Sequence, residues 1–332
     1  MNSTIKTHGK ILNNIQALRA FAAMNVVFFH IIFNAKIYGH PIAIFDFLDR
    51  WGSNGVDLFF VISGFVMIYI QHLKQKTPFG FFRDRVVRIV PIYWFFCVLI
   101  AVLLLLAPAL FKEMVFSASW FFSSLFFMSA IFEQRDPIVF VGWTIEYEML
   151  FYLLFGVSIF AKTLSKSCMA TILLILIGIL IFGAPPIMLE FVFGMLVGWV
   201  YVNKTTPAPI ALASLLLGVS TLLLSIWIKD IGVSRVVISG IPSALIVFGC
   251  VNMGQMKSNL FTKIGDSSYS IYLIQIFTIP AFYKLVKVSN ISLIHNDFLA
   301  FLCILTTVLA GLFLYGTFEV KVSNLLRIIK TA

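Results

Sequence analysis

The sequence has few charged residues, and it lacks the short motifs of many soluble enzymes. Only 11% of its 332 residues are charged, whereas 61% are hydrophobic; soluble domains carry about 25% charged residues. It contains no G-x-S-x-G elbow, no glycine-rich phosphate loop and no metal-ligand spacing. These absences exclude an ordinary soluble domain and argue against a nucleotide-loop protein or a metal-dependent catalyst. We expect no metal site.

Cysteine is also scarce. The four cysteines lie in or at the edges of apolar stretches and show neither metal spacing nor evident pairing: Cys97, Cys168, Cys250 and Cys303. Free cysteine is commonly buried, so we interpret all four as packing residues. No cleavable signal peptide is apparent, because the first apolar stretch is long and carries an arginine, and we expect it to be retained as a helix.

Long apolar stretches dominate the chain. About 20 apolar residues cross a bilayer as a helix, and this length predicts about ten spans: 14–34, 54–72, 89–111, 143–163, 167–184, 186–203, 207–228, 235–253, 268–287 and 297–319. Segment 117–132 is apolar but short and rich in serine, so we expect an interfacial or re-entrant piece. The predicted fold is all-α, a polytopic membrane helical bundle with a single domain over 1–332.

The net charge of +10 reflects membrane topology rather than nucleic-acid binding. Lysine and arginine lie mostly in the loops, and their distribution predicts that both termini are cytoplasmic. This topology places most of the intramembrane ionisable residues in the outer half of the membrane: His30, Asp57, Glu146, Glu148 and Glu190. Arg19 is then in the inner half, and the basic run Arg83, Arg85 and Arg88 is at the inner surface.

Two ionisable residues, Arg19 and His30, lie inside the first span. Such residues are costly in a membrane and usually serve function or pairing. Their spacing of eleven residues is almost three helical turns, so both side chains share one helix face, about 16 Å apart along the axis. His30 is the best general-base candidate, with Glu148 or Asp57 as the carboxylate that orients it. The alternative is a packing histidine that is hydrogen-bonded to a neighbour.

Two further stretches allow a functional and a structural interpretation. In Phe79–Trp94, aromatic residues alternate with cations, and Arg85 and Arg88 share a helix face. Arginine clusters suit phosphate recognition, but flanking cytoplasmic charge gives the same pattern.

We place Pro91 early in the third span, where proline is tolerated. Ser63 and Gly64 are either a nucleophile with a hinge or a site of close helix packing.

Five sequence blocks, taken in order, resemble the acyltransferase-3 family of integral membrane O-acyltransferases. They are QALRAFAAMNVVFFH with Arg19 and His30, GSNGVDLFFVISGFVM (Gly52–Met67), FRDRVVRIVPIYW (Phe82–Trp94), WTIEYEMLFY (Trp143–Tyr152) with Glu148 in the glutamate position, and IGDSSYSIYLIQ (Ile264–Gln275). The resemblance covers essentially the whole chain. At one place the chain departs from it: Gln275 stands where many members have histidine.

The resemblance implies transfer of an acetyl group from cytoplasmic acetyl-CoA to a sugar hydroxyl of a surface polysaccharide or its lipid-linked precursor. Acetyl-CoA would be a substrate, with no tightly bound cofactor, and a bacterial inner membrane fits the family. We expect Arg19, with Arg85 or Arg88, to hold the phosphates of the donor. On the acceptor side we expect Trp143, Tyr152, Ser270 and Tyr272.

Two other functions remain open from the residues alone. Intramembrane arginine, histidine and glutamate can mark the pathway of a transporter or a flippase, although the chain lacks the internal repeat that many transporters show. A non-catalytic membrane partner of a synthase complex is the third possibility. Only the enzyme would consume acetyl-CoA and release CoA, and only the partner would tolerate changes at His30 and Arg19.

Overall fold

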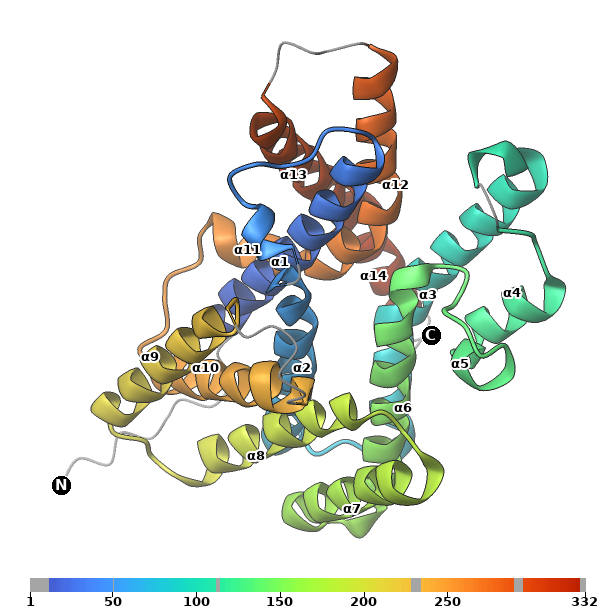
Figure 1. Cartoon of the computed structure of the whole chain (residues 1–332). Coiled ribbons are helices and arrows are strands. Elements are labelled where there is room, and N and C mark those ends of the chain that lie inside the picture. Colours follow the sequence, from blue (N-terminus) through green and yellow to red (C-terminus); the bar gives the residue numbers. More distant parts are fainter. Residues whose placement is uncertain (1–11, 50, 112–113, 228–233, 290–294, 329–332) are drawn as a thin grey trace. The chain divides into compact units, whose positions relative to one another are not determined.

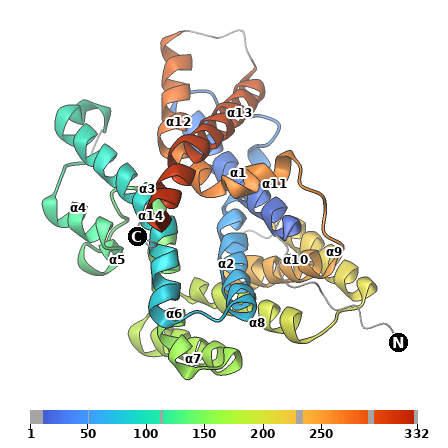
Figure 2. The same cartoon turned by 180° about the vertical axis from the view of Figure 1, so that it is seen from behind.

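The computed structural model describes residues 12–49, 51–111, 114–227, 234–289 and 295–328, and Figures 1 and 2 show it from opposite sides. The chain forms two compact units. Unit 1 comprises Met1–Ala22, Asn54–Pro78 and Val157–Asp266; unit 2 comprises Ala23–Ser53, Phe79–Gly156 and Ser267–Ala332. Helix α1 (Asn13–Ile37) contributes its start to unit 1 and its remainder to unit 2. The expectation of a single domain over 1–332 stays a prediction.

The described residues form helices and turns, with no strand among them, which confirms the all-α prediction. Eight segments are long and apolar enough to cross a membrane: Asn13–Ile37, Trp51–Leu73, Pro78–Leu106, Phe140–Ala161, Leu164–Phe182, Pro186–Asn203, Ser268–Val288 and Asn296–Leu326. The spans expected at 207–228 and 235–253 correspond to the shorter apolar helices Ala208–Leu224 and Val236–Asn252. The protein is therefore a multi-pass membrane protein. Both chain ends lie outside the described residues, and their cytoplasmic location stays a prediction.

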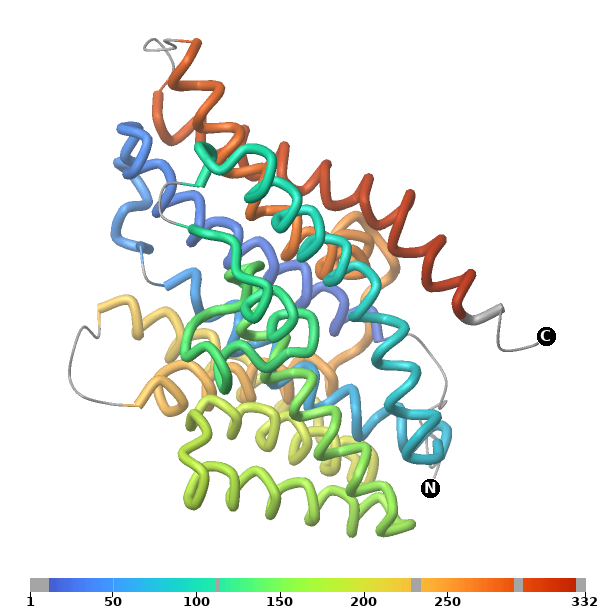
Figure 3. The backbone as a smooth tube through the Cα atoms, turned by 90° about the vertical axis from the view of Figure 1, so that its right-hand side faces the viewer, coloured from blue at the N-terminus to red at the C-terminus, as the bar shows by residue number. Residues whose placement is uncertain are grey.

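Unit 1 is built on close contacts between helix backbones. Its helices are α2 (Asn54–Leu73), α7 (Leu164–Phe182), α8 (Leu189–Asn203), α9 (Ala208–Leu224), α10 (Ile241–Asn252) and α11 (Leu260–Asp266). Helix α2 packs along α8 and α9 packs along α10, while α7 lies beside α8 (Figure 3). A Cβ on Gly194 would lie 2.0 Å from the carbonyl oxygen of Val61. One on Gly64 would lie 2.1 Å from that of Phe191, so Gly64 has the packing role that was one of its two interpretations.

Unit 2 contains the remainder of α1 and a second group of helices. These are α3 (Pro78–Leu106), α4 (Ala118–Leu125), α5 (Ser129–Phe132), α6 (Trp143–Ser158), α12 (Ser268–Val288), α13 (Asn296–Leu314) and α14 (Val320–Ile328). Helix α12 packs along α13 (Figure 1). A π-helical segment, Tyr315–Glu319, joins α13 to α14 without a break.

The start of α3 differs from the prediction. The third span was expected to begin at residue 89, with Pro91 near its start, but α3 begins at Pro78 and Pro91 lies inside it. Pro78 occupies the first turn of α3, where proline is favoured. The basic run Arg83, Arg85 and Arg88 follows within the same helix. With 29 residues, α3 is about 43 Å long, longer than the roughly 30 Å hydrocarbon core of a bilayer. Arg85 and Arg88 are therefore helical residues, as their proposed shared face requires.

Segment 117–132 does not form one crossing helix. It forms α4, with eight residues, and α5, with four. A helix of eight residues is about 12 Å long, too short to cross the hydrocarbon core. The predicted break between the fifth and sixth spans is confirmed: α7 ends at Phe182, with Gly183 in the left-handed conformation (φ +68°), and α8 begins at Leu189.

Candidate functional site

The candidate site in unit 2 is a pocket beside the first-helix histidine. We call it the His30 pocket; it has a volume of about 310 Å³ and is lined by Phe29, His30, Phe33, Asn34, Phe140, Gln275, Ile276, Ile279 and Pro280. Helix α1 supplies four of these residues and α12 another four. Most of the lining is apolar, so the side chains of His30, Asn34 and Gln275 supply its polar groups.

The imidazole of His30 is held by aromatic rings. The ring of Phe29 lies edge-on to it at 5.1 Å between centroids, and that of Phe140 at 5.3 Å. Among the described residues of unit 2, no side chain or backbone group forms a hydrogen bond with this imidazole. Glu148, the expected carboxylate partner, therefore forms no hydrogen bond with the His30 imidazole. The alternative of a packing histidine also required a hydrogen-bonded neighbour, and none is present among these residues. Within the described part of unit 2, the imidazole therefore lines the pocket without a hydrogen-bond partner of its own.

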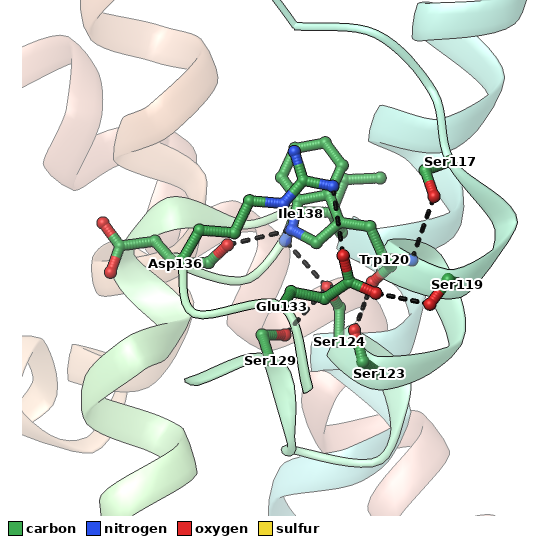
Figure 4. A network of polar contacts seen from close by, with 10 residues as sticks. Ser117, Ser119, Trp120, Ser123, Ser124, Ser129, Glu133, Asp136 and Ile138 are labelled. Carbon is green, nitrogen blue, oxygen red and sulfur yellow. Dashed lines mark hydrogen bonds and ion pairs between the residues drawn. The ribbon is translucent and has the colours of Figure 1, made fainter. Parts of the chain in front are cut away.

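Phe140 comes from a segment that is braced by its own polar contacts, shown in Figure 4. The indole nitrogen of Trp120 donates to the backbone carbonyl of Asp136 at 2.9 Å. The amide of Ile138 donates to the hydroxyl of Ser124 at 2.9 Å, and that hydroxyl donates to the Trp120 carbonyl at 2.7 Å. These bonds connect α4 to the residues directly before Phe140. They therefore fix where that ring meets His30.

Two acidic residues complete this bracing. Glu133 accepts a hydrogen bond from Ser119 (Figure 4). It also lies 3.5 Å from Arg135, whose guanidinium stacks over the Trp120 ring at 4.0 Å. The carboxylate of Glu146, on α6, accepts hydrogen bonds from the backbone amides of Ser129 at 2.9 Å and Ala130 at 3.2 Å. Glu146 was expected among the ionisable residues of the outer half of the membrane. Its hydrogen bonds join α6 to α5, so this carboxylate stabilises the packing of the two helices.

Glu148, the preferred orienting carboxylate, lies in a second cluster on α3 and α6. It accepts a hydrogen bond from the hydroxyl of Tyr152. The guanidinium of Arg85 lies 5.9 Å from the Tyr152 ring centroid and 6.0 Å from that of Phe81. Arg85 is only 8% exposed, and its Nε has no hydrogen-bond partner among the described residues. A buried guanidinium with an unused donor suits an anion.

Arg88, one turn further along α3, is half-buried and is among the charged neighbours of Arg85. Arg19 is half-buried on α1, the same continuous helix that carries His30. The expected spacing of these two residues along one helix is thereby confirmed. That any of these cations binds the donor stays a prediction.

The residues expected on the acceptor side have varied surroundings. Ser270 is buried and donates to Glu319 at 2.5 Å. The Tyr272 hydroxyl lies 2.8 Å from that of Thr144 and donates to the Val141 carbonyl at 2.9 Å. These bonds tie α12 to neighbouring segments of unit 2. Trp143 is half-buried at the start of α6, with its ring 5.7 Å from that of Tyr147. Contact with the acceptor stays a prediction for all of them.

Asp57, the other candidate carboxylate, lies in unit 1 and is fully buried. Arg235 donates to it twice, from Nε at 3.0 Å and from Nη2 at 2.7 Å. The carboxyl of Glu190 is also fully buried, and Gly240 is so close to it that a Cβ there would lie 3.0 Å from its Cγ. The sequence analysis gave Asp57 as a carboxylate that could orient His30, and no local pattern identified Arg235 as its partner.

With this geometry described, comparison with known proteins gives the class. The fold and the pocket define a polytopic membrane protein with a histidine-lined pocket between two of its helices. Residues 12–316 match the acyltransferase-3 family, described as an acyltransferase domain. The chain therefore belongs to this family, and it is a membrane enzyme that transfers acyl groups.

Two curated relatives are similar to it. The exopolysaccharide production protein ExoZ of Rhizobium meliloti (strain 1021) is 31% identical over 263 residues, which cover 70% of this chain and 78% of ExoZ. Nodulation protein 10 of Rhizobium leguminosarum bv. viciae is 29% identical over 160 residues, which cover 42% of each chain. No solved structure matches the chain.

Proposed function

We propose that the protein is an O-acetyltransferase of the bacterial inner membrane. It moves an acetyl group from cytoplasmic acetyl-CoA to a hydroxyl of a surface polysaccharide, such as O-antigen, capsule or exopolysaccharide, or of its lipid-linked precursor. The observation that carries this proposal is the His30 pocket, where an imidazole without a hydrogen-bond partner among the described residues of its unit lines a space of about 310 Å³. The name of the relative ExoZ, an exopolysaccharide production protein, supports a polysaccharide acceptor.

The chemistry follows from an imidazole beside a cavity. His30 accepts the proton of the acceptor hydroxyl while the hydroxyl oxygen attacks the thioester carbonyl carbon. The carbon–sulfur bond then breaks, and the proton passes from the imidazolium to the sulfur of the departing CoA. The products are the acetyl ester and free CoA. Phe29 and Phe140 hold the ring in place, and the apolar lining limits the access of water, which would compete as an acyl acceptor.

The cations are assigned to the donor. CoA carries phosphates, and arginine binds phosphate by paired, charge-assisted hydrogen bonds. Arg85 is the best supported of the three, because its buried Nε is without a partner among the described residues; Arg88 and Arg19 are the other two. Trp143, Tyr152, Ser270 and Tyr272 remain the candidates for the acceptor side. Glu148 accepts a hydrogen bond from Tyr152 in this structure, so Asp57 is the remaining candidate for positioning His30.

The test compares a strain that lacks the gene with the same strain complemented by wild type, by His30→Ala and by His40→Ala. His40 is the matched control, a histidine whose ring nitrogen lies 3.2 Å from Asn296 and which does not line the pocket. NMR of the surface polysaccharide is expected to show acetyl groups with wild type and His40→Ala only. If the deletion strain keeps its acetyl groups, or if membrane-inserted His30→Ala restores them fully, the proposal is wrong.

A second measurement separates the enzyme from a transporter. Membranes with the wild-type protein are expected to release free CoA from acetyl-CoA when the polysaccharide of the deletion strain is added, and His30→Ala membranes are expected not to do so. A transporter would alter the location of the polysaccharide without consuming the donor.

A further inference from the structure

The buried amide of Gln275 makes one hydrogen bond and leaves a second group unused. The side chain is 1% exposed and lines the His30 pocket from α12. Its Nε2 donates to the backbone carbonyl of Tyr272, one turn earlier, at 3.0 Å. Its Oε1 is buried and has no hydrogen-bond partner among the described residues. A buried polar atom without a partner costs free energy, so its retention calls for an explanation.

The bond to Tyr272 decides which way the amide faces. A carbonyl oxygen can only accept, so the amide nitrogen must face it and Oε1 points away from it. Oε1 can only accept as well. Gln275 therefore carries an unused acceptor in the α12 wall of the pocket, and α1 lines the same pocket with the imidazole. Asn34, the third polar side chain of the lining, donates from its Nδ2 to the backbone carbonyl of His30 at 2.9 Å.

We propose that Gln275 selects which sugar hydroxyl is acylated, by accepting a hydrogen bond from a second hydroxyl of the same sugar. This inference rests on the proposed function. The reacting hydroxyl has one proton, which goes to His30, and so it cannot also donate to Oε1. Another hydroxyl of the same sugar can donate. The acceptor class is thus a sugar with at least two free hydroxyls, one at the imidazole and a second at Gln275.

Gln275 takes no part in bond making, so its removal affects how the sugar is placed and leaves the donor unaffected. A site that binds a substrate hydroxyl discriminates strongly when the pairing is lost, because a polar group is left unsatisfied. Gln275→Leu removes the acceptor at similar size. We expect it to lower kcat/KM for the polysaccharide by about 10- to 100-fold, with the KM for acetyl-CoA within about twofold of wild type.

The experiment uses the full-length protein in lipid nanodiscs, radiolabelled acetyl-CoA, and polysaccharide from the deletion strain as the acceptor. The variants are Gln275→Leu and Gln275→Glu, which keeps an oxygen at the Oε1 position. The matched control is Thr278→Val, which removes a polar group of the same helix. Thr278 lies 3.0 Å from Thr307 and is not part of the pocket lining. NMR then maps the acetylated hydroxyls.

The inference predicts that Gln275→Leu loses acetylation or spreads it over other hydroxyls. Gln275→Glu keeps an acceptor but loses the donor to Tyr272, so it keeps the wild-type position at a lower rate, and Thr278→Val keeps both position and rate. It is overturned if Gln275→Leu acetylates the same hydroxyl at the wild-type rate. It is also overturned if its loss of activity follows a loss of thermal stability and raises the KM for acetyl-CoA equally, because that pattern belongs to a packing residue. Failure of wild type to acetylate the polysaccharide would instead refute the proposed function.

Discussion

Arg235 binds both carboxylate oxygens of Asp57, through Nε at 3.0 Å and Nη2 at 2.7 Å, although the two residues are 178 positions apart in the chain. Asp57 is fully buried, and the Arg235 side chain is 41% exposed. A two-point arginine–carboxylate pair is among the strongest hydrogen-bonded contacts in proteins. The contact joins the first turn of α2 to the segment before α10 and gives Asp57 a stabilising task within unit 1.

Replacing one partner of this pair is expected to destabilise the protein. Asp57→Asn should lower the free energy of unfolding by about 1–3 kcal/mol, less than the 3–5 kcal/mol of a fully buried pair, because Arg235 can reorient. Arg235→Gln should cost more, since it leaves a buried carboxylate unpaired. Thermal unfolding in detergent measures both changes. An unchanged Tm in Asp57→Asn, together with lost acyl transfer, would assign Asp57 to catalysis instead.

The backbone contact between α2 and α8 is expected to exclude even a methyl group. A Cβ on Gly194 would lie 2.0 Å from the Val61 carbonyl oxygen and 2.8 Å from the Phe65 amide nitrogen, and backbone atoms cannot turn aside. Gly194→Ala should therefore cost at least about 2 kcal/mol. Gly254→Ala is the control, because a Cβ there meets nothing within 4 Å. Equal amounts of the two variants in the membrane, with equal Tm, would contradict this account of the packing.

The hydrogen bonds from α5 to Glu146 should protect the backbone amides of α5 from hydrogen exchange. Glu146→Gln keeps the shape but offers one acceptor oxygen where the carboxylate offered two, so one of the amides of Ser129 and Ala130 loses its partner, at about 1–2 kcal/mol. We expect faster hydrogen exchange at α5 and an unchanged rate in α13. Glu133→Gln should have the smaller effect, because the Glu133 carboxylate contacts Ser119 and Arg135 and not the backbone amides of α5. Identical exchange in Glu146→Gln and wild type would show that α5 is held by other contacts.

Arg85 and Arg83 differ in what their surroundings predict. Arg85 is buried and its Nε has no hydrogen-bond partner in the part of the chain that the structure describes, whereas Arg83 is half-buried. Arg85→Met, which keeps much of the apolar stem, should raise the KM for acetyl-CoA about 10-fold or more, since a lost charged contact to phosphate is worth about 1.5–3 kcal/mol. Arg83→Met should leave it within about twofold. If both variants keep the wild-type KM, Arg85 is a structural cation of the cluster with Glu148.

The membrane-spanning helices were predictable because crossing a bilayer requires a long apolar stretch that is visible in one sequence. The start of α3 was not, because its first turns carry Arg83 and Arg85 and lack that signal, although Pro78 suits a helix start. An apolar stretch in the sequence predicts which part of a helix lies in the lipid. It does not predict the residue at which the helix begins.

The candidate site was predictable only in part. His30 stood out because an ionisable residue in an apolar span is unusual. The partner of Asp57 could not be named, since any of the 24 lysines and arginines was possible and the pairing depends on tertiary packing. Gln275 was noticed only as a departure from the family resemblance. Its unused acceptor became visible once the His30 pocket and the bond to Tyr272 were known.

Helix α1 runs unbroken from Asn13 to Ile37, and this continuity fixes the distance between the side chains it carries. The axial distance from Arg19 to His30, about 16 Å, is set by the count of residues between them and by nothing else. Each residue added or removed in that interval would turn one side chain about the axis by about 100° relative to the other. The number of residues in this interval therefore sets whether the two side chains share a helix face. The identity of the apolar residues between them can vary with the packing around them.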